Sequence, residues 1–188
     1  MRRFADDTMN YIEAETERIL VNTGFAYGLD EATHFPEAVE THIKKLLSAP
    51  NNLKKGSSKR RNFRNQCVFT IDPRTARDLD DALHIRRLPK SSGDTSTKSS
   101  MPVYEVGVHI ADVSFYVRPD DPVDTEAAMR ATSIYLVQLC IPMLPRALCE
   151  DLCSLHPGAD KFTFSVVFTL DEEANVCLHS GFCCLLLR

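Results

Sequence analysis

The sequence has few of the features that mark membrane proteins, secreted proteins and nucleotide-cofactor enzymes. No run reaches the roughly 18–20 consecutive apolar residues that a membrane-spanning helix needs, so we expect no membrane partner. The first residues, Met1 to Asp7, lack the apolar core of a signal peptide. The glycine patterns of phosphate-binding and dinucleotide-binding loops are missing, as is the nucleophile elbow of serine hydrolases. These absences exclude the motif-based forms of those enzyme classes.

Charge and cysteine content narrow the class of protein further. Acidic residues number 26 against 22 basic residues, a net charge of −4, so any basic surface for nucleic acid must be local. The seven cysteines include no CxxC pair, which is typical of free thiols in a reducing compartment, and we expect a cytoplasmic protein. Cys149 and Cys153 fit packing on one helical face better than a zinc site, because no second pair of ligands stands at zinc spacing.

One acidic stretch concentrates the candidate chemistry. Asp72, Asp78, Asp80 and Asp81 place four carboxylates within ten residues, between two apolar, strand-like runs. Like charges held together repel, at a cost of about 4 kcal/mol for a pair ~4 Å apart at an effective dielectric constant of ~20. A divalent cation relieves that cost, and Mg²⁺ prefers hard oxygen ligands. Two such ions can activate a water and stabilise the leaving oxygen in phosphodiester hydrolysis.

Spacing alone leaves other interpretations of this stretch open. The segment Asp78-Leu-Asp-Asp81 is also typical of a solvated turn or a helix N-cap. An EF-hand loop is excluded, because a loop starting at Asp78 would place Leu83 at the glycine position and Pro89 at the bidentate glutamate. The cluster is therefore either a metal site or a set of turn carboxylates.

Other candidate site residues are weaker. His109 and Asp112 stand three apart as a possible ligand pair, but a histidine hydrogen-bonded inside a sheet is the interpretation that we favour. Tyr135 and Phe115 could stack on nucleic-acid bases or could pack in the core.

The apolar pattern predicts an α+β fold, because strands and helices mix without a regular βαβ alternation. The predicted helices cover residues 5–22, 37–47, 124–135 and 146–152. The predicted strands cover residues 68–71, 82–87, 103–111, 113–117 and 161–170. We expect residues 1–60 to form a helical connector with a basic linker, and residues 61–188 to form the main domain. The linker, 50–62, could contact phosphate or remain solvated.

Several motifs in a fixed order carry a resemblance. They are Phe69-Thr-Ile-Asp-Pro-x-x-Ala-x-Asp-Leu-Asp-Asp-Ala82, Val106-Gly-Val-His-Ile-Ala-Asp-Val113, Ile141-Pro-Met-Leu-Pro-Arg146 and Leu152-Cys-Ser-Leu155. Over about residues 60–172 the chain resembles the RNB catalytic domain of the RNase II / RNase R exoribonuclease family. Within that family it is similar to the eukaryotic Dis-three-like branch. Residues 8–22 look like the connector just upstream of that domain.

The resemblance implies a function in RNA decay. Members of the family hydrolyse single-stranded RNA from its 3′ end to nucleoside monophosphates, with Mg²⁺, and Mn²⁺ is a possible substitute. Carried onto this sequence, Asp72 and Asp81 would ligate the metal directly and Asp78 would complete the metal site. Asp80 would orient or activate the attacking water. Tyr135 matches the tyrosine that stacks on a base near the scissile bond.

The resemblance also implies that much of the enzyme is missing here. Family members carry OB-type domains upstream and an S1 domain downstream, and we expect the latter half of the RNB domain to lie past Arg188. The alternative to a complete exoribonuclease is therefore a truncated, catalytically incomplete fragment with only metal or weak RNA binding. Such a half domain should leave apolar strand faces uncovered, notably at Phe162, Phe164, Val166 and Phe168.

Overall fold

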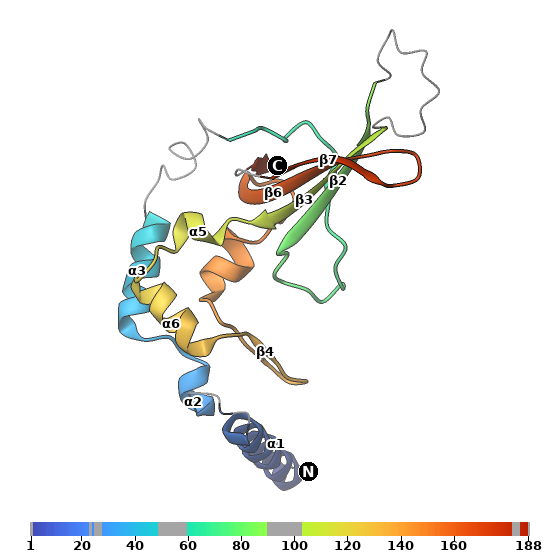
Figure 1. The fold of residues 1–188 in the computed structure, drawn as a ribbon. Coiled ribbons are helices and arrows are strands. Elements are labelled where there is room, and N and C mark those ends of the chain that lie inside the picture. Colours follow the sequence, from blue (N-terminus) through green and yellow to red (C-terminus); the bar gives the residue numbers. More distant parts are fainter. Residues whose placement is uncertain are drawn as a thin grey trace. The chain divides into compact units, whose positions relative to one another are not determined.

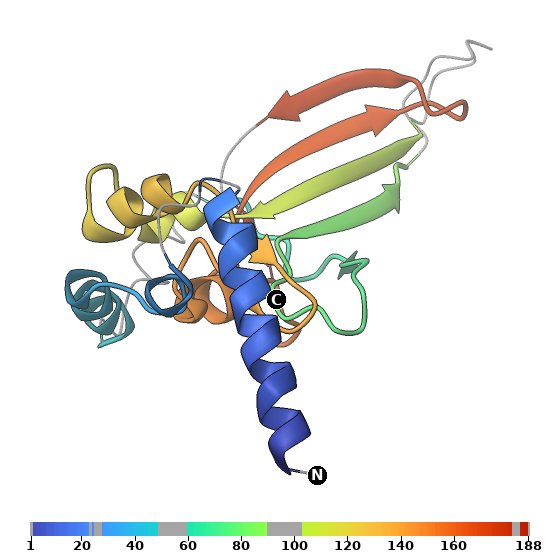
Figure 2. The same cartoon turned by 90° about the horizontal axis from the view of Figure 1, so that it is seen from below.

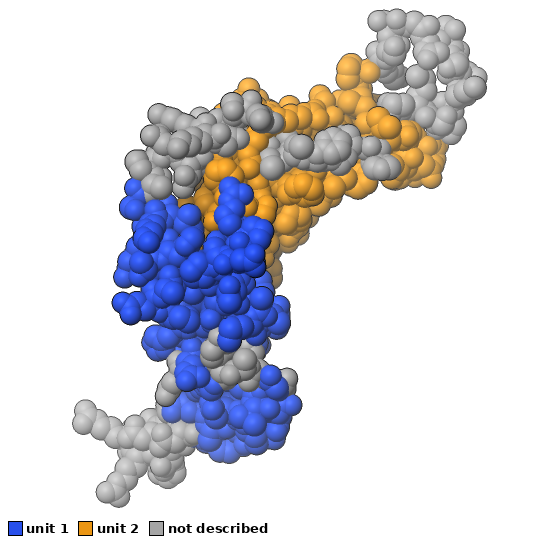
Figure 3. Space-filling model, turned by 60° about the vertical axis from the view of Figure 1, so that its left-hand side comes forward, with its two compact units in different colours: residues 1–48, 117–146 blue, residues 49–116, 147–188 orange. Residues whose placement is uncertain are grey.

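The computed structural model describes residues 2–22, 24, 28–48, 60–89, 103–181 and 185–187. The chain falls into two compact units, coloured separately in Figure 3. Unit 1 comprises residues 1–48 and 117–146, and unit 2 comprises residues 49–116 and 147–188. Most of the predicted basic linker lies outside the described residues, and the predicted domain boundary at residue 60 stays a prediction. The predicted α+β class is confirmed.

Unit 1 is mainly helical. Its elements are α1 (Arg2–Asn22), α2 (Leu29–Ala32), α3 (Glu37–Ser48), α6 (Pro122–Arg130), β4 (Ile134–Tyr135) and β5 (Cys140–Ile141). The predicted helices over residues 5–22 and 37–47 are confirmed as α1 and α3. Leu20, Ala32 and Ile141 are buried together as a core that joins α1, α2 and β5. None of the helices in the described ranges is long and apolar enough to cross a membrane.

The predicted helix over residues 124–135 is wrong at both ends. It begins earlier because the carboxylate of Asp121 caps it, accepting hydrogen bonds from the backbone N–H groups of Val123 (2.8 Å) and Asp124 (2.9 Å), with Pro122 in the first turn. It ends at Arg130 because the backbone of Ala131 leaves the helical region, with a positive φ of 62°. The following residues form β4, which pairs with β5 as a hairpin.

Unit 2 is built on one antiparallel sheet. Its strands are β1 (Val68–Phe69), β2 (Asp81–Arg87), β3 (Tyr104–Ala111), β6 (Lys161–Leu170), β7 (Val176–Gly181) and β8 (Leu185–Leu187). The strand order is β1-β2-β3-β6-β7, and β8 also pairs with β6. The long strands lie side by side in Figures 1 and 2. The predicted strand over residues 161–170 coincides with β6.

The predicted strand over residues 113–117 is wrong, because this segment forms the short helix α5 (Val113–Tyr116). Its side chains favour a strand, but the buried carboxylate of Asp112 accepts hydrogen bonds from the Ser114 hydroxyl (2.7 Å) and the Phe115 N–H (3.2 Å). That capping stabilises a helical turn over an extended one. The predicted helix over residues 146–152 is present as a π-helical turn, Ala147–Leu152.

The two faces of the sheet in unit 2 have opposite chemistry. The buried face carries polar groups, namely His84, Glu105, His109, Thr163 and Ser165. The other face is apolar and partly exposed, with exposed fractions of 55% at Ile85, 46% at Ile110 and 57% at Phe164. The predicted uncovered row on β6 is therefore confirmed at Phe164 but wrong at Phe162. Phe162 is buried because Phe115 and the guanidinium of Arg60 pack on its ring.

Candidate active site

The four aspartates lie where the chain enters β2. Asp72 and Asp78 belong to the irregular segment between β1 and β2. Asp80 immediately precedes β2, and Asp81 is its first residue. Asp72, Asp80 and Asp81 are exposed and Asp78 is half-buried, so the carboxylates face solvent rather than the core.

Hydrogen bonds to two other segments hold the backbone at Leu79 and Asp80. The Asp80 carbonyl accepts a hydrogen bond from the Ala111 N–H at the end of β3 (2.9 Å). The carbonyl of Leu79 accepts from the Leu155 N–H (2.8 Å), and the Leu79 N–H donates to the hydroxyl of Ser154 (2.9 Å). Ser154 is fully buried. The motif Leu152-Cys-Ser-Leu155 thus has a structural role that sequence reasoning missed: it fixes the acidic segment.

The negative charges of the other three aspartates act on Asp80. The pKa of Asp80 is raised above its ordinary value, first by loss of hydration and then by the negative charges of Asp78, Asp81 and Asp72. Both effects disfavour the ionised carboxylate, although the residue as a whole keeps an exposed surface. All three other aspartates thus act on Asp80, and the roles predicted for the four residues stay predictions.

The donor set of this cluster fits Mg²⁺, because it offers only carboxylate oxygens and its mutual repulsion calls for a counter-charge. Among the residues that the structure describes, however, no group of three or more histidine, cysteine, aspartate or glutamate side chains is arranged so that it could hold a metal ion. The predicted ligands Asp72, Asp78 and Asp81 are neighbours without forming a finished coordination shell. Ion binding would require their carboxylates to move closer together.

A small pocket lies in the same unit, beside the strand that leads to Asp72. Its volume is about 180 Å³. It is lined by Val68, Phe69, Thr70, Ala82, Leu155, His156, Pro157, Ala159 and Lys161. The pocket is thus bounded by residues that flank the acidic segment and by the segment that follows Ser154.

Comparison with known proteins identifies the family. An RNB domain model matches residues 60–182. The chain belongs to the RNB family. It is 46% identical over 170 residues to the DIS3-like exonuclease 2 of Xenopus tropicalis, covering 88% of this chain but 18% of the frog protein. It is also 48% identical over 118 residues to a protein of Arabidopsis thaliana named inactive exonuclease DIS3L2, covering 63% of this chain and 10% of that protein.

A solved structure supports the same assignment. The RNase R of Mycoplasma genitalium, in complex with ribose-methylated single-stranded RNA, is similar with a TM-score of 0.69 and 26% sequence identity. The match covers 82% of this chain and 22% of that chain. The resemblance read from the sequence motifs is confirmed. This chain spans less than a quarter of the length of each of these relatives.

His109 and Asp112, the two other candidate site residues of the RNB motifs, are both buried and both have polar partners. His109 is hydrogen-bonded inside the sheet, as we favoured, with His84 (2.7 Å) and Ser165 (2.9 Å) as partners. Asp112 instead forms a buried ion pair with Arg60 (2.8 Å). His109 and Asp112 thus have separate partners.

The structure also shows the surroundings of Cys153, Phe115 and Tyr135. Burial raises the pKa of the Cys153 thiol to about 12, so it stays protonated and packs. Phe115 packs against Phe162 and Tyr116 in unit 2. Tyr135 lies in the β4–β5 hairpin of unit 1, where it is 69% exposed. Of the two aromatic candidates, only Tyr135 presents a largely exposed ring.

Proposed function

We propose that this chain supplies the metal-binding carboxylates of a magnesium-dependent exoribonuclease. The enzyme would hydrolyse single-stranded RNA in the 3′→5′ direction to nucleoside monophosphates. The observation that carries the proposal is the electrostatic coupling of Asp80 to Asp72, Asp78 and Asp81, in a segment that Ser154 and its neighbour anchor. Membership of the RNB family supports the substrate class.

The carboxylates would divide the work. Asp72 and Asp81 would hold the metal, and Asp78 would complete its site. Magnesium, when bound, supplies positive charge to the scissile phosphate and to a bound water. The raised pKa of Asp80 makes its carboxyl a better proton acceptor than an ordinary aspartate, which suits a group that orients or deprotonates water.

Tyr135 would contribute to RNA binding. Its exposed ring offers a face on which a base can stack, and such stacking is worth about 1–3 kcal/mol per base. Replacement with leucine would keep apolar area but remove the aromatic face. We therefore assign Tyr135 a role in positioning the RNA and no role in the hydrolysis step.

A second candidate function is metal or weak RNA binding without catalysis. Two observations favour it: the chain spans 18% of the frog relative, and a similar Arabidopsis protein is named inactive. Positioning of RNA by other domains would be lost in an isolated piece, and proximity supplies a large share of catalytic power. We expect the 188-residue chain alone to show no processive hydrolysis.

The test is a chimera assayed on 5′-labelled single-stranded RNA with Mg²⁺. Residues 60–182 of this chain replace the matching segment of the frog relative, with and without Asp80→Asn. We expect the chimera to release mononucleotides from the 3′ end, and Asp80→Asn to lower the rate by about 10²–10³ while RNA binding is kept. A chimera as inactive as its Asp80→Asn variant, with normal RNA binding, would favour the non-catalytic candidate.

A further inference from the structure

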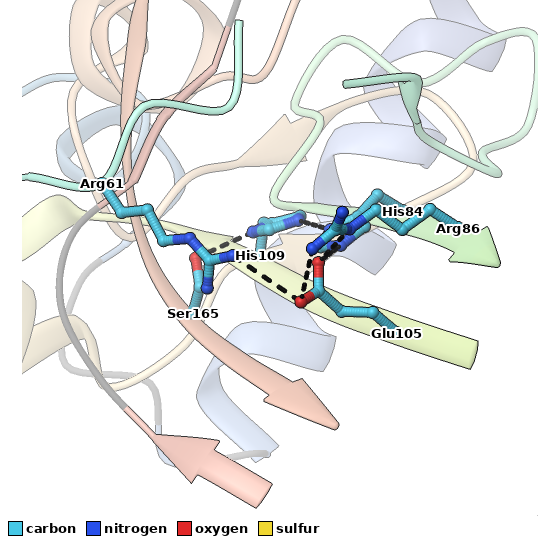
Figure 4. Close-up of polar contacts among 6 residues, drawn as sticks. All are labelled: Arg61, His84, Arg86, Glu105, His109 and Ser165. Carbon is cyan, nitrogen blue, oxygen red and sulfur yellow. Dashed lines mark hydrogen bonds and ion pairs between the residues drawn. The ribbon is translucent and has the colours of Figure 1, made fainter. Parts of the chain in front are cut away.

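A buried chain of hydrogen bonds crosses the sheet of unit 2 (Figure 4). His84 Nδ1 lies 2.7 Å from His109 Nε2, and His109 Nδ1 lies 2.9 Å from the Ser165 hydroxyl. At the other end, His84 Nε2 lies 3.3 Å from a carboxylate oxygen of Glu105. His84, His109 and Ser165 are at most 1% exposed. This chain of hydrogen bonds thus links β2, β3 and β6 in the interior, away from solvent.

The direction of every hydrogen bond follows from Glu105. Arg86 donates to both of its carboxylate oxygens, at 2.6 and 3.0 Å, and this bonding lowers the pKa of Glu105 to about 2. An ionised carboxylate only accepts, so His84 must donate through Nε2 and accept at Nδ1. His109 must then donate through Nε2 and accept at Nδ1 from the Ser165 hydroxyl.

Both imidazoles are neutral in this arrangement. Burial lowers the pKa of His84. Burial, and after it the repulsion that two charged rings would exert on each other, lowers the pKa of His109 to about 4. A neutral imidazole has one donor and one acceptor, and each ring uses both. The oxygen of Ser165 accepts in turn from the Thr163 hydroxyl, 3.0 Å away, because its own proton is committed to His109.

This geometry fits only one pairing of β2 with β3. His84 pairs opposite Gly107, and Ala82 pairs opposite His109, so the two imidazoles meet diagonally across the glycine. A Cβ atom on Gly107 would lie 2.3 Å from the His84 ring. A shift of two residues would keep each side chain on its face but would place a larger residue under the His84 ring.

Ser154 and Leu155 anchor the backbone just before β2, but within the strand hydrophobic patterning does little to fix the register. Hydrophobic patterning specifies register strongly only where a face is buried, and the apolar face here is partly exposed at Ile85 and Ile110. The aspartates at the start of β2 repel one another and cannot fix their own position. The hydrogen-bond chain begins three residues further along the same strand.

We propose that His84, His109 and Ser165 form a register lock, in which the two histidines are positioning residues for Asp80 and Asp81. The consequence for catalysis rests on the proposed function, whereas the register and the tautomers do not. Asp81 pairs with Ile110, and the Asp80 carbonyl is bound by Ala111, only in the locked register. The lock therefore sets where the carboxylates emerge from the sheet.

The first test observes the tautomers directly. Nitrogen-15 NMR of the histidine side chains is recorded on the 188-residue chain at neutral pH. We expect His84 and His109 both to be neutral with the proton on Nε2. A charged ring, or a proton on Nδ1 of either residue, would overturn the proposal.

The second test separates hydrogen bonding from packing. His109→Phe keeps a buried ring but removes both hydrogen bonds. Phe63→Leu is the matched control, because the ring of Phe63 contacts both imidazoles, at centroid distances of 5.0 and 5.6 Å, without hydrogen bonding. Cross-strand nuclear Overhauser effects between Asp81 and Ile110 report the register, and broadening of the Asp80 and Asp81 amides by Mn²⁺ reports ion binding.

We expect His109→Phe to lose the Asp81–Ile110 contact and to need roughly 10- to 100-fold more Mn²⁺ for the same broadening. Phe63→Leu should change neither. Native register and Mn²⁺ response in His109→Phe would overturn the lock. If that variant does not fold, Ser165→Ala is used, which removes one hydrogen bond of the lock. The proposal then requires both rings to keep the proton on Nε2, as Glu105 dictates, and the chain to need more Mn²⁺ for the same broadening; an unchanged Mn²⁺ response would overturn it. If the wild type keeps its register and tautomers but shows no Mn²⁺ effect, the lock stands and the proposed function fails.

Discussion

The acidic cluster and the register lock share strand β2, but their surroundings differ. The aspartates are largely exposed, and the pKa of Asp80 is raised by loss of hydration and then by the like charges of the other three. The lock is buried, and each of its polar groups has a hydrogen-bond partner. The hydrogen bonds from Arg86 lower the pKa of Glu105, whereas burial lowers the pKa of both histidines and keeps them neutral. Satisfied buried groups stabilise one fold, whereas unsatisfied like charges cost stability and favour a ligand.

The largest expected effect is on the lock and comes from acid. The pKa of His109 is lowered from 6.5 to about 4, so between these values the unfolded chain binds a proton that the folded chain does not. Stability is then complete above about pH 6.5 and falls as the pH drops towards 4, by about 3 kcal/mol for this fully buried group. Urea unfolding at both pH values measures the loss.

His109→Phe is the control for this acid effect, since it removes the titrating group but keeps a ring. Its stability should depend less on pH over the same range. Glu105 does not affect the comparison. The stability that its ionised carboxylate contributes is lost mostly below about pH 4, as the pH falls towards its lowered pKa of about 2, and it is lost equally in both proteins. Equal losses in the wild type and in His109→Phe would contradict the neutral buried histidine.

An added methyl group at Gly107 tests the lock through packing. Its Cβ atom would lie 2.3 Å from the His84 ring and 2.9 Å from His109 Nε2. We expect Gly107→Ala to lower the free energy of unfolding by about 2–3 kcal/mol. Gly158→Ala is the control: nothing lies within 4 Å of its Cβ, and only its positive φ of 81° opposes the change, at about 1 kcal/mol. Similar losses of stability in the two variants would mean that the His84 ring does not require a glycine at position 107.

Ser154→Ala tests the boundary between the two regions. It removes the buried hydroxyl that accepts from the Leu79 N–H and leaves that half-buried donor without its side-chain acceptor, at a cost of about 1–2 kcal/mol. Because Leu79 precedes Asp80, the change should also weaken divalent-ion binding. Thr132→Ala removes an exposed hydroxyl and should change stability by less than about 0.5 kcal/mol. Ion binding unaltered in Ser154→Ala would argue against the anchoring role.

Asp80→Asn should have the smallest effect on stability, and the opposite sign. The raised pKa means that the folded chain holds this proton more tightly than the unfolded chain, so the ionised group destabilises the fold at neutral pH. We expect the amide to stabilise the metal-free chain by about 0.5 kcal/mol, small because the site is exposed. Asp160→Asn is the control, since it breaks the ion pair with Arg64 and should not stabilise. A clear loss of stability in Asp80→Asn would contradict the repulsion.

The sequence predicted one of these regions and missed most of the other. The four closely spaced aspartates between strand-like runs can be recognised from the sequence alone, and so can the bounds of β6. His84 gave no signal, because its meeting with His109 depends on a strand register that spacing does not reveal. The helix at Val113–Tyr116 was missed because the cap at Asp112 outweighs strand-forming side chains. The end of α6 was missed because the positive φ of Ala131 has no marker in an alanine-rich segment.

The central claim is that the four aspartates form a site for a divalent cation, and a magnesium titration tests it most directly. Unfolding free energies of the 188-residue chain are measured across Mg²⁺ concentrations for the wild type, Asp72→Asn/Asp81→Asn, and the control Asp120→Asn/Asp160→Asn. The wild type and the control should gain about 2.7 kcal/mol when Mg²⁺ reaches roughly 100 times its dissociation constant, and the Asp72/Asp81 variant should gain almost nothing. The same small gain in all three proteins would contradict the claim.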